Sequence, residues 1–161
     1  MEGSDSMAKT IAIGRQDFER MRTRNVFYID KTDFIREWWE AEDEVTLITR
    51  PRRFGKTLNM SMTEQFFSVD YAGRGDLFEG LSIWEDEKYR KLQGTYPVIS
   101  LSFANVKEGT YEMTKQGICR VLTDLYNKKY FLLKTGLLTE EEQEYFRSIS
   151  MNMSEVTAAV A

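Results

Sequence analysis

The chain has 161 residues, of which 42% are hydrophobic and 30% charged, so the composition predicts a soluble globular protein with one hydrophobic core. The formal net charge is −4, which disfavours wholesale binding to nucleic acid or to an anionic membrane and requires any anion site to be local. A single cysteine, Cys119, and the lack of histidine exclude an internal disulfide, a His-based catalytic triad and a zinc site.

The N-terminal residues 1–7 have no basic-then-apolar signal pattern and read as a disordered leader. No apolar run in the sequence approaches the ~18 residues of a membrane span. We therefore expect a cytoplasmic protein.

Short elements are predicted before residue 50. Residues 17–22 read as a polar helix, and residues 26–29 as a strand or an extended entry. Asp30 or Thr32 can cap a helix to about residue 40, whose apolar residues repeat at helical spacing. Residues 45–49 are rich in β-branched residues, which predicts a buried strand.

A P-loop has the pattern Gly, four residues, Gly-Lys-Ser/Thr. Gly55-Lys56-Thr57 matches the end of this pattern, and Arg50 stands where the first glycine is expected. In such a loop the backbone amides surround the β-phosphate, Lys56 reaches the β- and γ-oxygens, and the Thr57 hydroxyl binds Mg²⁺. A chance tripeptide on a surface turn is the alternative. We predict that ATP and Mg²⁺ bind at these residues: Arg50, Pro51, Arg52, Arg53, Phe54, Gly55, Lys56, Thr57 and Leu58.

Five elements are predicted from the loop onward. Helices are expected over residues 56–67, about 85–92 and 110–129, with a strand over 98–103. Residues 139–142 form a capping-box pattern that begins another helix. The order of strand, loop and helix predicts an α/β, P-loop NTPase-like fold, with an incomplete and mostly parallel sheet flanked by helices.

The arginines of the loop have three interpretations. Arg50, Arg52 or Arg53 could add charge to the triphosphate or sense its γ-phosphate, or form a nucleic-acid contact patch. They could equally form surface salt bridges, which contribute little individually.

Hydrolysis of ATP requires a second acidic residue at the end of another apolar strand, the Walker B element. After residue 57, no run of four apolar residues ends in Asp or Glu, and the segment ending at Phe103 continues without a carboxylate. We therefore expect little or no hydrolysis by this chain. The apolar segment cut off at Ala161 suggests a fragment truncated before Walker B.

Two stretches of the sequence, residues 28–32 (YIDKT) and 47–62 (LITRPRRFGKTLNMSM), resemble the bacterial AAA-ATPase-like proteins. The resemblance continues through residues 77–81 and 96–103 and covers nearly all of residues 8–161, with arginine in place of the first glycine of the loop. It implies a P-loop α/β domain with an ATP-binding role. Full-length members commonly carry a nuclease-like domain of the PD-(D/E)XK type further on, through which nucleic acid could be a partner.

The resemblance also implies a role for the segment before the loop strand. In related ATPases such a segment lies near the adenine, so Tyr28, Asp30 and Lys31 are expected to border the base or ribose. The alternative is that Asp30 caps a helix and Tyr28 packs in the core.

Two competing functions stay open at this stage. A nucleic-acid-binding module would show salt-dependent DNA binding. A nucleotide-gated protein-interaction module could use the aromatic residues as an interface, and an oligomer would then change mass with nucleotide.

Overall fold

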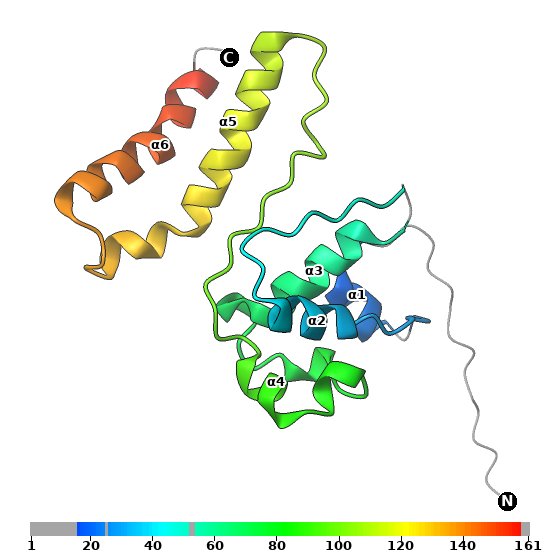
Figure 1. Cartoon of the computed structure of the whole chain (residues 1–161). Helices are drawn as coiled ribbons and strands as arrows, with labels where there is room; N and C mark the ends of the chain where they lie inside the picture. The colour runs from blue at the N-terminus through cyan, green and yellow to red at the C-terminus, as the bar shows by residue number, and fades with distance from the viewer. Residues whose placement is uncertain (1–15, 25, 52–53, 159–161) are drawn as a thin grey trace, which may run out of the picture. The chain divides into compact units, whose positions relative to one another are not determined.

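The computed structural model describes residues 16–24, 26–51 and 54–158, and describes side chains as far as residue 150. The chain forms two compact units, Met1–Val98 and Ile99–Ala161 (Figure 1). Each unit is helical, and the pocket described below lies in the first.

The described residues of the first unit form four α-helices joined by loops and 3-10 turns. Asp17 caps the first helix by accepting a hydrogen bond from the Arg20 amide at 2.8 Å. Asp86 caps the fourth helix in the same way. The helices are α1 Phe18–Thr23, α2 Asp33–Ala41, α3 Lys56–Phe67 and α4 Glu87–Leu92.

The second unit is a helical hairpin of α5 Tyr111–Lys128 and α6 Glu140–Ala158, joined by the 3-10 turn Tyr130–Lys134 (Figure 1). The predicted capping box is present: the Thr139 amide donates to Glu142 Oε2 at 2.8 Å, and the Glu142 amide donates to Thr139 Oγ1 at 3.3 Å. The backbone of α6 stays helical through Ser154.

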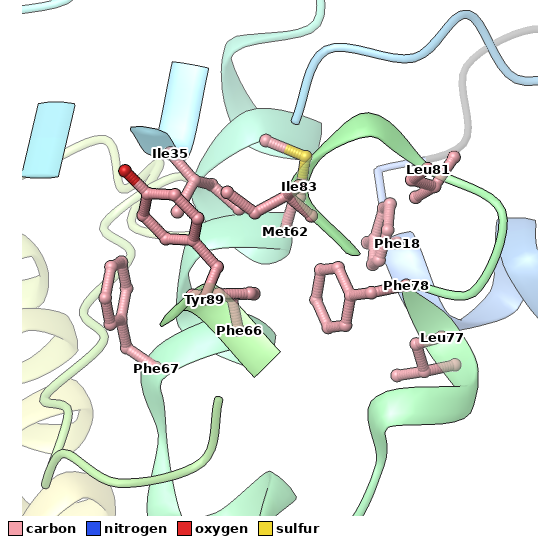
Figure 2. Packing of buried hydrophobic residues seen from close by; sticks show 10 residues of the cluster. All are labelled: Phe18, Ile35, Met62, Phe66, Phe67, Leu77, Phe78, Leu81, Ile83 and Tyr89. Carbon is pink, nitrogen blue, oxygen red and sulfur yellow. The ribbon is translucent and has the colours of Figure 1, made fainter. Parts of the chain in front are cut away.

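The core of the first unit is an aromatic and aliphatic cluster around α3. Phe66 is fully buried, and its ring lies 5.0 Å from that of Phe67 and 5.1 Å from that of Phe78, both in edge contacts. The cluster, drawn in Figure 2, consists of Phe18, Ile35, Met62, Phe66, Phe67, Leu77, Phe78, Leu81, Ile83 and Tyr89.

The predicted α/β fold is wrong: the described residues contain helices and no strand. Pairing among them is limited to isolated bridges, such as the one between Ser68 and Tyr96. Residues 45–49 and 98–103 do lack helical structure, as β-branched residues favour, but no ladder pairs with either segment in the described part of the chain.

Burial shows the same error in the strand prediction. Val45 is 87% exposed and Leu47 82% exposed, where a central strand would bury both. Composition predicted the extended backbone, but a sheet also needs neighbouring strands, which composition cannot supply.

Candidate functional site

A pocket of about 800 Å³ opens between α2, the segment that precedes the glycine–lysine loop, and the start of α3. This volume falls in the usual range of small-molecule sites, ~300–1,000 Å³. The lining combines residues of the predicted phosphate loop with residues of the segment before α2. These residues are Asp30, Lys31, Asp33, Phe34, Glu37, Thr46, Leu47, Ile48, Thr49, Arg50, Pro51, Phe54, Lys56 and Asn59.

The loop turns into α3 at Gly55, which has a left-handed backbone with φ of 75° and occupies the N-cap position. No side chain that the structure describes caps this helix start. The first backbone hydrogen bond of the helix runs from the Asn59 amide to the Gly55 carbonyl at 2.9 Å. Amides at the beginning of a helix carry partial positive charge and lack intrahelical partners, so this end of α3 offers donors to an anion.

The amine of Lys56 folds back over the loop and donates a hydrogen bond to the carbonyl of Arg50. This contact closes the loop between its first residue and the first residue of α3. It also places the amine at the wall of the pocket, where Lys56 and Arg50 are both lining residues. The predicted phosphate-binding lysine is therefore held in position by its own loop.

The remaining predicted loop residues differ in placement. Pro51 and Phe54 line the pocket, and the Phe54 side chain is 57% exposed. Thr57, expected to bind Mg²⁺, is exposed in the first turn of α3 and is not among the lining residues. Leu58 packs against the hydrophobic core, so only its backbone faces the helix start. Arg52 and Arg53 lie outside the described residues.

Tyr28 is directed into the protein. Its hydroxyl donates to the sulfur of Met62 at 3.2 Å, and its ring meets Phe18 edge-on at 5.5 Å. Burial raises the pKa of the Tyr28 hydroxyl to about 12. Tyr28 is absent from the pocket lining, so these contacts match the packing interpretation of this residue.

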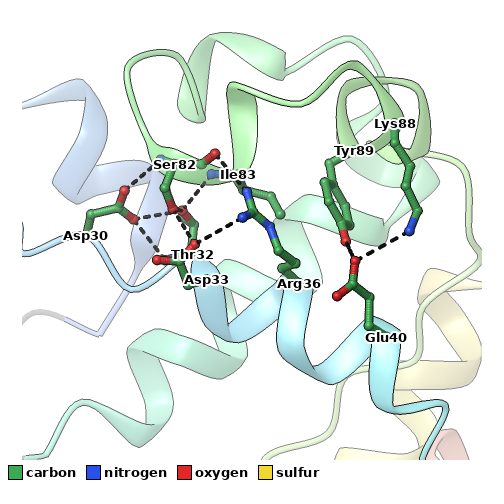
Figure 3. Close-up of polar contacts among 9 residues, drawn as sticks. All are labelled: Asp30, Thr32, Asp33, Arg36, Glu40, Ser82, Ile83, Lys88 and Tyr89. Carbon is green, nitrogen blue, oxygen red and sulfur yellow. Dashed lines mark hydrogen bonds and ion pairs between the residues drawn. The ribbon is translucent and has the colours of Figure 1, made fainter.

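Asp30 lies at the centre of a polar network that joins the segment before α2 to residues 82–83 (Figure 3). Its carboxylate accepts hydrogen bonds from the Thr32 amide at 2.8 Å, the Thr32 hydroxyl at 2.7 Å and the Ser82 amide at 2.7 Å. The Thr32 hydroxyl also accepts from the Ile83 amide at 3.2 Å. Thr32 occupies the N-cap position of α2 without capping it by its side chain.

This network keeps Asp30 ionised. Partial burial of the carboxylate raises its pKa, but the hydrogen bonds from Ser82 and Thr32 outweigh burial and hold the pKa below its ordinary value. Because Asp30 accepts from Thr32, two residues further on, and from the distant Ser82, it fixes the backbone that carries Lys31.

Lys31 is exposed and lines the same pocket as Lys56. A Cβ atom placed on Gly55 would lie 3.6 Å from Lys31 Nζ, so this amine reaches the turn that begins α3. The structure thus brings together Lys31, Arg50 and Lys56, which are separated in the sequence.

Sequence reasoning missed the contribution of α2 to the pocket. Phe34 and Glu37, one helical turn apart, both line it, and so does Asp33. The indole nitrogen of Trp38 donates to the Thr46 hydroxyl at 3.0 Å, which ties the following segment to α2. The spacing of three residues between Phe34 and Glu37 predicts that they share one face of the helix. It does not predict that this face lies opposite the loop.

No group of three acidic, histidine or cysteine side chains suited to a metal ion occurs in the described part of the chain. The magnesium expectation therefore depends on Thr57 and on ligands from outside the protein, and it stays a prediction. In the same residues, no helix is long and apolar enough to cross a membrane.

The described residues define a helical protein with a pocket beside a glycine–lysine helix start, lined by three basic and three acidic side chains. The chain belongs to the AAA-ATPase-like family of predicted AAA-ATPases, whose model matches residues 12–160. The family resemblance seen in the sequence is thereby confirmed, whereas the nuclease-like domain and the fragment interpretation stay predictions.

A relative from Azotobacter chroococcum mcd 1, described as an uncharacterized protein in the vnfD 5′ region, is 33% identical over 96 residues. The match covers 59% of this chain and 17% of that protein, so the chain spans a small part of the relative's length. No solved structure matches the chain.

Proposed function

We propose that this chain binds ATP, together with Mg²⁺, in the pocket beside residues 50–57. The proposal rests mainly on one observation: Lys31, Arg50 and Lys56 line the same pocket. This pocket lies next to the start of α3, which no described side chain caps. Membership of a family of predicted ATPases supports the same ligand class.

The basic side chains of the pocket are available to an anionic ligand. Three cationic side chains, Lys31, Arg50 and Lys56, line this pocket together with the carboxylates of Asp30, Asp33 and Glu37. None of the three cationic side chains forms an ion pair with another described residue. A polyphosphate would offset their mutual repulsion and accept hydrogen bonds from the helix start.

The rest of the lining suits a nucleotide. Phe34 and Phe54 contribute aromatic surface on which a base can stack, and Phe54 is more than half exposed. Thr57, which lies outside the lining in the first turn of α3, offers one hydroxyl for Mg²⁺, which usually takes the rest of its ligands from phosphate oxygens and water. The proposal covers binding, with slow or no hydrolysis, because no run of four apolar residues after the loop ends in a carboxylate.

The test compares the wild-type chain with Lys56→Ala in ligand-dependent unfolding. With MgATP at ~100 times its dissociation constant, the wild type should gain about 2.7 kcal/mol of stability. Lys56→Ala should gain little, because the truncation removes the amine held beside Arg50.

Lys91→Ala is the matched control, since Lys91 is exposed on α4, pairs with Glu87 and lies outside the pocket. This variant should be stabilised by MgATP as strongly as the wild type. A folded wild-type chain that gains no stability from MgATP would contradict the proposal, as would equal gains for the wild type and Lys56→Ala.

A further inference from the structure

The two neighbours of Lys31 in the chain, Asp30 and Thr32, are both hydrogen-bonded to residues 82–83. Asp30 accepts from the Ser82 amide and the Thr32 amide, and the Thr32 hydroxyl accepts from the Ile83 amide (Figure 3). The bonds from Ser82 and Ile83 join residues that are 52 and 51 positions apart in the sequence. Lys31 therefore projects from a backbone that is fixed before any ligand arrives.

The side chain of Lys31 has no stabilising polar contact with the described residues. It forms no ion pair or side-chain hydrogen bond with any residue that the structure describes. It is also exposed, although it extends along the protein toward Gly55. A lysine that folds over a glycine turn without a partner has its three N–H donors available to a ligand.

The position of its amine identifies the part of the ligand it would meet. Lys31 Nζ lies 3.6 Å from the point where a Gly55 side chain would begin, and Gly55 directly precedes Lys56 and the uncapped start of α3. Any group held by the amides of this turn therefore lies within reach of Lys31. The absence of a side chain at Gly55 leaves the amine close to the backbone.

We infer that Lys31 is a second phosphate-binding lysine, which contacts the same polyphosphate as Lys56 from the segment before α2. The inference rests on the proposed function, and it replaces the expected base or ribose contact of Lys31 with a phosphate contact. An ammonium group interacts more strongly with a phosphate than with a neutral hydroxyl, and the neighbouring cations Arg50 and Lys56 favour an anion between them.

Acidic residues of the same pocket limit how far this charge extends. Asp30, Asp33 and Glu37 also line it, and Asp33 accepts from the Ser82 hydroxyl at 2.8 Å. All three come from α2 and the segment before it, so the loop side with Arg50 and Lys56, which the Lys31 amine approaches at Gly55, contributes no carboxylate to the lining. A polyphosphate should therefore occupy that side, with the rest of the nucleotide directed along the remaining lining.

The experiment titrates the full chain with MgATP, MgADP, AMP and adenosine by calorimetry. Lys31→Gln should weaken MgATP binding about tenfold, which corresponds to ~1.4 kcal/mol. Its effect should decrease with each phosphate removed and vanish for adenosine. Lys31→Arg, which keeps the charge, should restore most of the affinity, and Lys91→Gln should bind all four ligands like the wild type.

Two further readouts distinguish this role from a structural one. The urea midpoint of Lys31→Gln should equal that of the wild type, because the side chain has no partner among the described residues. The difference in MgATP affinity between the two proteins should narrow in high salt, because salt screens exposed charges.

Wild-type affinity for MgATP in Lys31→Gln, with a loss in Lys56→Ala, would overturn this inference and leave the proposed function standing. An equal loss for adenosine and MgATP in Lys31→Gln would overturn it in favour of a base or ribose contact. No MgATP binding by the folded wild type would overturn both.

Discussion

The two units of the chain are both helical, yet they differ in how much they bury. In Met1–Val98, ten buried side chains form one cluster around α3. In Ile99–Ala161, the buried side chains among those described are Thr123 and Phe146. All the residues that line the pocket belong to the first unit, so the proposed site is built on the larger core.

Helix formation and the formation of a buried core are therefore separate properties of this chain. In the second unit, α5 and α6 have good caps and a strong contact between Tyr126 and Phe146, whose rings are 4.8 Å apart. Large side chains such as Tyr111 and Leu137 nevertheless stay more than 75% exposed there. Caps and periodicity define helices locally, whereas burial depends on what the rest of the chain packs against them.

The largest expected effect contrasts the two buried phenylalanines. Phe66→Ala should cost about 3–5 kcal/mol of unfolding free energy, because Phe66 is fully buried between two other rings. Phe146→Ala should cost less than Phe66→Ala, because Phe146 is 8% exposed and its truncation removes less buried surface.

Urea unfolding measures both changes. Tryptophan fluorescence reports the first unit, since Trp38, Trp39 and Trp84 all lie in it, and far-UV circular dichroism reports all helices. Phe27→Ala, at a side chain that is 53% exposed, serves as the control and should change stability by under ~1 kcal/mol. A cost for Phe146→Ala equal to that for Phe66→Ala would break the comparison between the units.

The next effect concerns the network that joins the segment before α2 to Ser82. Asp30→Asn should cost about 1–3 kcal/mol, because the amide group replaces a carboxylate that accepts three hydrogen bonds and brings a donor toward other donors. Asp43→Asn is the control, since Asp43 is exposed and has no such contacts.

The pKa of Asp30 gives this prediction a pH dependence. Because the folded-state pKa is below the ordinary value, the stabilisation by the carboxylate is present at neutral pH and is lost as pH falls through the folded-state pKa. The stability difference between wild type and Asp30→Asn should therefore shrink below about pH 4. A difference that is the same at pH 7 and pH 3 would show that ionised Asp30 does not stabilise the fold.

The smallest expected effect concerns residues 45–49, which were predicted to form a buried strand and are not buried as one. Leu47→Ala should change stability by under ~0.5 kcal/mol, because Leu47 is 82% exposed. Leu77→Ala, at a side chain that is 1% exposed in the same unit, should cost about 2–5 kcal/mol. Similar losses for the two variants would show that Leu47 is buried as a strand residue would be.

Local signals in the sequence predicted the helices well. The helix expected over residues 56–67 is α3, and in the capping box predicted at residues 139–142 the Glu142 amide donates to Thr139 Oγ1. Each of these signals acts within a few residues, so one sequence contains all the information they need.

Features that depend on distant contacts could not be predicted in this way. The predicted strands fail because β-propensity at Val45 and Leu47 says nothing about a pairing partner. The approach of Lys31 to Gly55 depends on the hydrogen bonds between Asp30 and Ser82, which lie 52 residues apart. Of the predicted loop residues, Arg50, Pro51, Phe54 and Lys56 line the pocket, whereas the face of α2 that also lines it was not predicted.

The most direct test of the proposed site is a crystal structure of the chain with a non-hydrolysable ATP analogue and Mg²⁺. We predict the triphosphate in the pocket, with its oxygens within hydrogen-bond distance of the amines of Lys31 and Lys56 and of the amides that begin α3. An analogue bound elsewhere on the protein, with the Lys56 amine still donating to the Arg50 carbonyl, would contradict the account.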